Sequence, residues 1–286
     1  MIGVRSPLPS SSFPNGASPR NRLGRILRQA VRSLSSASVG GAFALVSLLW
    51  CAACAADSAA PALTVLAAAS TTPIGPPLAQ AWANPELEVH YRWGSSGSLA
   101  RQAADDAPGD VLLCAHPRWI EWLRAKKALA SEPVPFASNR LVAVVPKSAG
   151  ANMAATHLGE LVAALQPGER LGIGDAGVPL GDYTRQALQH AQADESARPF
   201  LVALPDARAV LRAAEQGQVR AAIVYRSDAL QSSAKVLFEI PSEAHDPIRY
   251  WACVLAAAQH PEAAQSYLEF LRSDKARSIL ERFAFQ

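Results

Sequence analysis

The stretch Leu63-Thr-Val-Leu-Ala-Ala-Ala-Ser70 is a short, almost wholly apolar run that ends in a serine. Its length and composition predict a β-strand that is buried on both faces, as in a parallel sheet. Thr71-Thr-Pro73 follows, and Pro73 suits a first helical turn because its missing N–H would have no partner there. A serine at such a corner either caps the helix or offers its hydroxyl and N–H to an anion. The segment alone leaves both interpretations open.

Alternation of strands and helices continues through the rest of the chain. Further apolar strands are expected at 88–93, 111–115, 141–145, 171–174, 221–225, 236–240 and 250–256. Apolar residues spaced i, i+3, i+4, i+7 predict amphipathic helices around 207–214, 264–271 and 276–283. This alternation predicts an α/β fold with helices on both faces of its sheets. Proline-containing segments at 131–139 and 242–247 are expected to be connectors, by which the chain leaves one lobe and later returns to it.

The first 56 residues differ in charge from the rest of the chain. They contain six arginines and no acidic residue, whereas residues 57–286 carry 21 basic and 24 acidic side chains. The basic segment, the apolar run 39–56 and the small residues of Cys51-Ala-Ala-Cys-Ala-Ala56 predict a secretory signal peptide over residues 1–56. An uncleaved membrane anchor and lipidation at Cys54 are the alternatives. No basic patch follows Arg32, which argues against a nucleic-acid-binding body.

Two cysteines, Cys114 and Cys253, follow the leader, and both lie in apolar, strand-like runs. In an exported protein they could form one disulfide. Their apolar settings favour two buried free thiols, because free cysteine behaves as a small hydrophobe.

Four further segments could supply groups that bind a ligand. Gly94-Ser-Ser-Gly-Ser98 follows one strand and leads into a helix, and Gly172-Ile-Gly-Asp-Ala-Gly-Val-Pro-Leu-Gly181 does the same. Asp206 is a plausible N-cap, and Tyr225 ends a strand. Each segment also fits a plain turn, cap or core edge, and none is a Walker A loop or a dinucleotide motif. Together with Ser70 they predict that helix N-termini and hydroxyls converge on one small anion without a cation.

These segments resemble, in order and spacing, the periplasmic molybdate-binding proteins of ABC uptake transporters. The resemblance covers residues 62–286. It is carried by Leu-Ala-Ala-Ala-Ser70, Gly-Ser-Ser-Gly-Ser98-Leu-Ala-Arg-Gln, Pro108-Gly-Asp-Val-Leu-Leu-Cys-Ala-His116 with Trp119, Leu141-Val-Ala-Val-Val-Pro-Lys147, Arg170-Leu-Gly-Ile-Gly-Asp175, Val178-Pro-Leu-Gly181, Ile223-Val-Tyr225-Arg-Ser-Asp228 and Ile240-Pro-Ser-Glu-Ala-His245-Asp-Pro-Ile-Arg-Tyr250.

The resemblance implies a type II periplasmic-binding-protein architecture, with two α/β lobes and a ligand cleft between them. Lobe 1 would comprise residues 62–140 and 245–286, and lobe 2 residues 141–244. The protein would capture molybdate or tungstate in the periplasm and deliver it, as a monomer, to an ABC permease with its ATPase subunit. No cofactor is implied, and no metal site other than the oxyanion itself. The implied donors are the hydroxyl and N–H of Ser70 and Ser96, the N–H of Leu180 and Ala207, and the hydroxyl of Tyr225.

The chain departs from that family's pattern at a few positions. Leu180 replaces a small residue, Ala207 a valine and Ala176 a proline, and Gly75-Pro-Pro77 interrupts the expected first helix. These changes leave open a second hypothesis, in which the same fold binds another small oxyanion or an organic acid.

Catalysis is a third hypothesis, and the residue pattern argues against it. The histidines have no metal-ligand spacing, and neither a G-x-S-x-G elbow nor a Cys-His signature is present. Asp110 and Asp175 belong to different lobes in this arrangement and are expected to shape turns.

Overall fold

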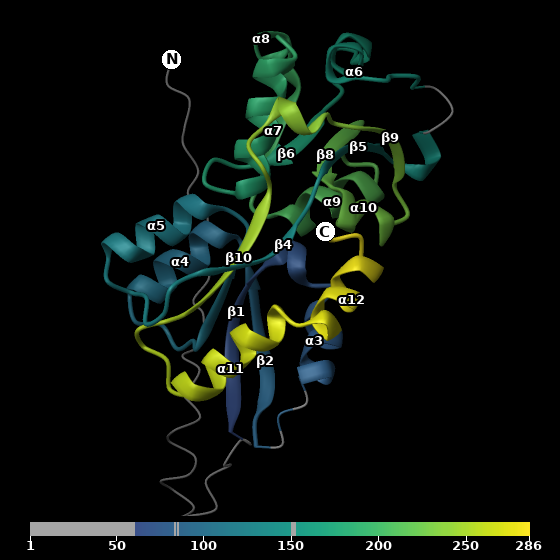
Figure 1. The fold of residues 1–286 in the computed structure, drawn as a ribbon. Coiled ribbons are helices and arrows are strands. Elements are labelled where there is room, and N and C mark those ends of the chain that lie inside the picture. The colour runs from purple at the N-terminus through teal and green to yellow at the C-terminus, as the bar shows by residue number, and fades with distance from the viewer. Residues whose placement is uncertain (1–60, 83, 85, 150–152) are drawn as a thin grey trace, which may run out of the picture. The chain divides into compact units, whose positions relative to one another are not determined.

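The computed structural model describes residues 61–82, 84, 86–149 and 153–286 of the chain. The predicted signal peptide at 1–56, with Cys54, lies outside the described residues. Two five-stranded sheets organise the described part, and we call each sheet with its helices a lobe (Figure 1). Among the described residues no helix combines the length and the apolar composition that would let it cross a membrane.

Lobe 1 is built on the sheet β2-β1-β3-β10-β4. Its strands are β1 (Ala62–Ala68), β2 (Glu88–Gly94), β3 (Val111–Cys114), β4 (Val134–Ser138) and β10 (Arg249–Val254). β1 is parallel to β2 and β3, whereas β10 is antiparallel to β3 and β4. The helical segments of lobe 1 are η1 (Ala69–Thr71), α3 (Gly75–Trp82), α4 (Ser96–Ala104), α5 (Pro117–Ala125), α11 (Pro261–Leu271) and α12 (Asp274–Arg282).

Both faces of the lobe 1 sheet are covered, as the continuous apolar strands predict. Leu66 of β1 packs with Leu99 of α4 and Ile120 of α5 on one face. Val65 packs on the other face, in the core that includes Leu78 of α3 and Leu268 of α11. The period-2 alternation of strand side chains therefore supplies two separate helix-packing surfaces.

Lobe 2 is built on the sheet β7-β6-β8-β5-β9. Its strands are β5 (Leu141–Val145), β6 (Leu171–Gly174), β7 (Leu201–Leu204), β8 (Ala221–Tyr225) and β9 (Lys235–Glu239). Its helical segments are η2 (Lys147–Ala149), α6 (Leu158–Ala164), α7 (Pro179–His190), α8 (Asp194–Ala197), η3 (Arg198–Phe200), α9 (Ala207–Glu215), α10 (Arg226–Leu230) and η4 (Ser242–Ala244).

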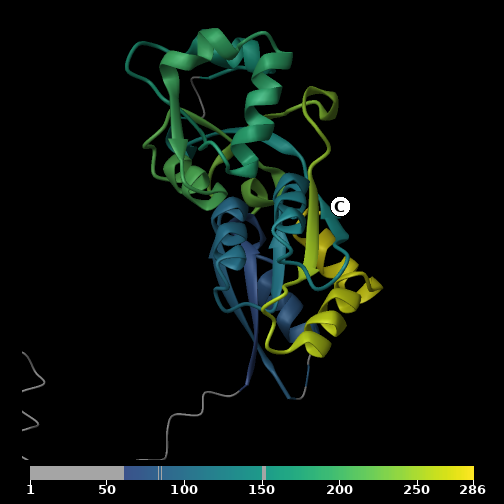
Figure 2. The same ribbon diagram turned by 90° about the vertical axis from the view of Figure 1, so that its left-hand side faces the viewer.

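The chain passes between the lobes twice, directly from β4 to β5 and back from β9 through η4 to β10 (Figure 1, Figure 2). Every strand of the first sheet lies within residues 62–140 or 245–286, and every strand of the second lies within 141–244. The residue boundaries of the lobes themselves remain a prediction.

Three local expectations need correction. The segment 131–139 is not only a connector, because it contains β4 with Pro135; β4 is an edge strand, where a missing N–H is tolerated. Pro73 lies in a turn between η1 and α3, and not in the first turn of a helix. α3 begins only at Gly75, so Pro76 and Pro77 fall in its first turn, where their missing N–H groups break no helical bond.

Cys114 in β3 and Cys253 in β10 are both free and buried. They lie on neighbouring antiparallel strands, but Cys253 is paired in register with Leu112 and Cys114 with Trp251. Burial raises the pKa of the Cys114 thiol to about 11, so it stays protonated near neutral pH.

Candidate functional site

The five residues expected to hold the anion line one small, tight cavity between the lobes. Ser70 and Ser96 come from lobe 1, and Leu180, Ala207 and Tyr225 come from lobe 2. Each of the five is at most 5% exposed. The remaining lining residues are Ala68, Ala69, Gly94, Ser95, Ala115, Val178 and Pro179.

Ser70 lies in η1, immediately after β1, and it is not a helix N-cap. The neighbouring Thr71 and Thr72 hydroxyls donate 2.7 Å hydrogen bonds back to the carbonyls of Ala68 and Ala69. The Ser70 hydroxyl instead accepts a 3.0 Å hydrogen bond from the Tyr250 hydroxyl. Its own hydrogen therefore remains available toward the cavity that it lines.

Ser96 is the first residue of α4, and Ser95 before it is the N-cap, accepting from the Ser98 N–H at 3.2 Å. The Ser96 N–H belongs to the first turn, where backbone donors have no partner within the helix. Its hydroxyl oxygen accepts a 3.0 Å hydrogen bond from the Ala115 N–H. As at Ser70, a protein donor is bound to the hydroxyl oxygen, and the Cys114 thiol also interacts with the Ser96 side chain.

Lobe 2 presents two helix N-termini to the same cavity. Leu180 follows Pro179, the first residue of α7, and Ala207 is the first residue of α9. Asp206 is the N-cap of α9, as predicted, and its carboxylate accepts from the Ala209 N–H at 2.8 Å. The N–H groups of Leu180 and Ala207 both belong to first helical turns, where donors have no intrahelical partner and the helix dipole favours an anion.

Tyr225 ends β8 and contributes a hydroxyl to the cavity. This hydroxyl is buried and has no hydrogen-bond partner among the described residues. Burial is the largest cause that raises the pKa of Tyr225 well above its ordinary value, so the group keeps its proton and can donate. A buried donor without a partner is costly, and a bound anion would satisfy it.

The cavity carries no formal charge on any described residue that lines it. Asp228 is buried nearby in α10 and pairs with Arg208 at 3.3 Å. Burial raises the pKa of Asp228 to about 7, against the opposing effect of Arg208. The described residues contain no cluster of three metal-ligating side chains.

Asp110 and Asp175, which are expected from the sequence to shape turns, both accept hydrogen bonds from backbone N–H groups. Asp110 accepts hydrogen bonds from the backbone N–H groups of Thr64, Gln259 and His260 at 2.7–2.8 Å. Asp175 accepts from the Ala176 N–H at 2.7 Å. Neither lines the cavity.

Contacts between the lobes border this site, and reasoning from sequence missed them. The Trp119 indole N–H of α5 donates to the Gly177 carbonyl at 3.2 Å, and Arg118 pairs with Asp182 at 2.7 Å. The Tyr183 hydroxyl donates to the Ala115 carbonyl at 3.3 Å. Of the side chains in these contacts, only Trp119 belongs to the segments that carry the resemblance, and its position in the sequence indicates no role for it.

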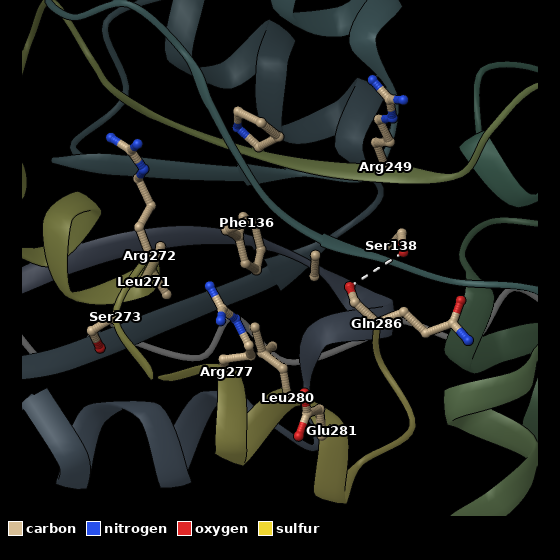
Figure 3. A pocket seen from close by; sticks show the side chains of 12 residues that line it. Phe136, Ser138, Arg249, Leu271, Arg272, Ser273, Arg277, Leu280, Glu281 and Gln286 are labelled. Atoms are coloured by element: carbon tan, nitrogen blue, oxygen red, sulfur yellow. Dashed lines mark hydrogen bonds between the residues drawn. The ribbon is translucent and has the colours of Figure 1, made fainter. Parts of the chain in front are cut away.

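A second hollow, on lobe 1, is wider and open (Figure 3). Arg249, Arg272 and Arg277 lie around Phe136 there, and Arg277 already pairs with Asp274 at 3.2 Å. The three arginines are exposed, and the hollow measures about 510 Å³. In a hollow this accessible to solvent a small anion stays hydrated. Ion pairs between an anion and exposed arginines would add little to its binding. The small cavity between the lobes is therefore the candidate ligand site.

Comparisons with known proteins agree with the fold. Residues 63–286 match the family model of bacterial extracellular solute-binding proteins. The molybdate-binding protein ModA of Haemophilus influenzae is 29% identical over 228 residues, which are 78% of this chain and 89% of that protein. ModA of Escherichia coli is 30% identical over 227 residues, which are 78% of this chain and 88% of that protein.

A solved structure shows the same fold at lower identity. The periplasmic molybdate-binding protein of Azotobacter vinelandii superposes with a TM-score of 0.70 at 20% identity, covering 78% of this chain and 98% of that one. The chain therefore belongs to the family of bacterial extracellular solute-binding proteins.

Proposed function

We propose that the chain captures molybdate or tungstate in the cavity between its lobes and hands it to an ABC importer. One observation carries this proposal: five groups predicted from five separate segments line one small cavity without a formal charge. The proposed donors are the hydroxyls of Ser70, Ser96 and Tyr225 and the backbone N–H groups of Ser70, Ser96, Leu180 and Ala207. Two relatives named as molybdate-binding proteins support the choice of anion.

Hydrogen bonds in such a site are strong enough to replace a counter-cation. Each bond to a charged group contributes about 1.5–3 kcal/mol, and the helix N-termini add a favourable dipole. The low dielectric of a buried cavity strengthens these interactions relative to water. The proposal is therefore binding without catalysis, with discrimination among anions by size and by protonation.

Calorimetric titration of the purified protein tests the proposal. We expect tight binding of molybdate and tungstate and little heat from sulfate, because donors set at one radius would be left unmatched by a smaller anion. Equal affinities for molybdate and sulfate would contradict the proposed selectivity. If none of the three anions binds, the proposed function is wrong.

Delivery to a transporter requires an exported protein and a change that signals loading. We infer that residues 1–56 direct export to the periplasm, that the protein acts as a monomer, and that closure of the lobes around the anion presents a joint surface to the permease and its ATPase subunit. Membership of the extracellular solute-binding family supports the compartment.

A second candidate ligand class rests on Leu180. Its side chain is fully buried and it lines the cavity, where a bulkier residue than the family's usual small one changes the available space. Another small oxyanion or an organic acid would then be the solute. A thermal-shift screen separates the two, because a ligand that binds only the folded state raises the melting temperature.

A further inference from the structure

Tyr250 connects the anion cavity to both passages of the chain between the lobes. It lies in β10, just after the second passage, and its side chain is fully buried. Its hydroxyl donates to Ser70 Oγ at 3.0 Å and accepts from Asn139 Nδ2 at 3.4 Å. Asn139 lies in the first passage, and its backbone N–H donates to the Ile248 carbonyl at 3.2 Å. The two passages and Ser70 thus share one buried chain of hydrogen bonds.

The direction of this chain is set by the Asn139 amide. Its Oδ1 accepts from the backbone N–H groups of Arg140 at 2.9 Å and Ser227 at 3.4 Å. A backbone N–H can only donate, so the oxygen must face these groups and the NH₂ must face the other way. There it donates to Ser227 Oγ at 2.8 Å and to the Tyr250 hydroxyl. Tyr250 then uses its single hydrogen on Ser70.

The same direction of hydrogen bonding continues to Ser70, whose oxygen accepts from Tyr250. A serine hydroxyl has one hydrogen and two lone pairs, and here the Tyr250 hydroxyl already occupies one of the lone pairs. Burial raises the pKa of Tyr250 above its ordinary range, so Tyr250 stays protonated and the direction holds at physiological pH. Ser70 can satisfy its own hydrogen only by donating it, and it lines the cavity. A buried donor left without an acceptor is costly, which favours an anion that accepts.

We propose that Tyr250, oriented by Asn139, is a positioning residue that fixes Ser70 as a hydrogen-bond donor and so selects anions that carry no proton. This inference rests on the proposed function, because it assigns a selectivity to the same cavity. An anion that retains a proton must donate it, and Ser70 accepts it less readily because the Tyr250 hydroxyl already occupies one of its two lone pairs. Without Tyr250, the Ser70 hydroxyl can rotate and accept.

The test compares three anions on Tyr250→Phe: molybdate and tungstate, which carry no proton at neutral pH, and inorganic phosphate, which keeps at least one. The variant loses one hydroxyl and keeps the ring. The ring can therefore keep its edge-to-face packing with Tyr225 and Phe285, whose ring centroids lie 6.1 Å and 5.3 Å from that of Tyr250. We expect molybdate and tungstate affinities to fall by roughly tenfold while phosphate affinity, measured by displacement of molybdate, is unchanged or higher. Tyr267→Phe is the matched control, since Tyr267 is also buried and hydrogen-bonded, to Tyr91 at 2.7 Å, away from the cavity.

A double-mutant cycle separates positioning from general support of the fold. If Tyr250 acts through Ser70, Tyr250→Phe should not change the molybdate-to-phosphate ratio once Ser70→Ala is present. A fall of equal size for all three anions, or an undiminished effect of Tyr250→Phe in the Ser70→Ala background, would overturn the inference and leave the proposed function standing. A wild-type protein that binds none of the anions would overturn both.

Discussion

At the scale of single residues, the cavity shows how uncharged groups become committed donors. Ser96 is held by the Ala115 N–H, as Ser70 is held by Tyr250. Tyr225 has no partner among the described side chains and keeps its proton because it is buried. In the proposed complex each of these hydroxyls would donate its hydrogen, so the anion would accept hydrogen bonds from several directions.

Ser96→Ala tests this commitment directly. It removes one charge-assisted hydrogen bond to the anion, so we expect molybdate affinity to fall by about tenfold or more, corresponding to about 1.5–3 kcal/mol. Calorimetry gives the change. Ser98→Ala is the matched control, because Ser98 lies on the same helix, accepts from Gln102 at 3.1 Å and does not line the cavity. Wild-type affinity in Ser96→Ala would show that the anion lies elsewhere.

At the scale of secondary-structure elements, the closeness of the lobes depends on a glycine at the start of α4. A Cβ built on Gly97 would lie 2.5 Å from Trp119 Cζ2 and 2.8 Å from the Gly177 carbonyl oxygen. Such contacts are far inside van der Waals separation, so α4, α5 and the loop before α7 can meet only if this position has no side chain. The Trp119–Gly177 hydrogen bond depends on the same approach.

Gly97→Ala should therefore loosen the contact between the lobes. We expect weaker binding and faster release of molybdate, because overpacking destabilises the contact between the lobes by about 1–3 kcal/mol. Stopped-flow release and calorimetry measure the two effects. Gly159→Ala in α6 is the control, since its Cβ would meet only the His157 ring, at 3.3 Å. Release rates that match wild type in Gly97→Ala would mean that the lobes do not need this approach.

Elements were predictable where local pattern decides them and missed where packing decides them. β5 has the predicted bounds because its apolar run ends abruptly, and the periodicity of α9 matched its buried face. β4 lies where the sequence predicts a connector, because Pro133 and Pro135 disfavour a strand. A strand is possible there only because β4 is at the edge of its sheet. β7 is short and incompletely buried, so it lacks a strong apolar signal.

The contacts between the lobes could not be predicted from local pattern. The partner of the Trp119 indole N–H is the carbonyl of Gly177, which belongs to the other lobe.

At the scale of the whole molecule, we predict that residues 1–56 are removed during export. We expect the mature protein to begin close to residue 57 and to be recovered from the periplasm, because the basic and apolar leader ends in small residues. N-terminal sequencing and intact mass spectrometry of the exported protein check this. A lipid-modified Cys54 at the mature end would replace cleavage near residue 57 with anchoring, and an intact leader would favour the uncleaved anchor.

The buried cysteines have a practical consequence for measuring solute capture. Cys114 and Cys253 are the only cysteines in residues 61–286, and both are enclosed between sheet and helices, with thiol pKa values raised by burial. Thiol-reactive dyes modify thiolates, so they should pass over both positions. A single cysteine placed at Arg118, half-exposed at the rim where it meets Asp182 of the opposite lobe, would then be labelled alone. The fold thus provides an optical reporter scaffold without first needing its native thiols removed.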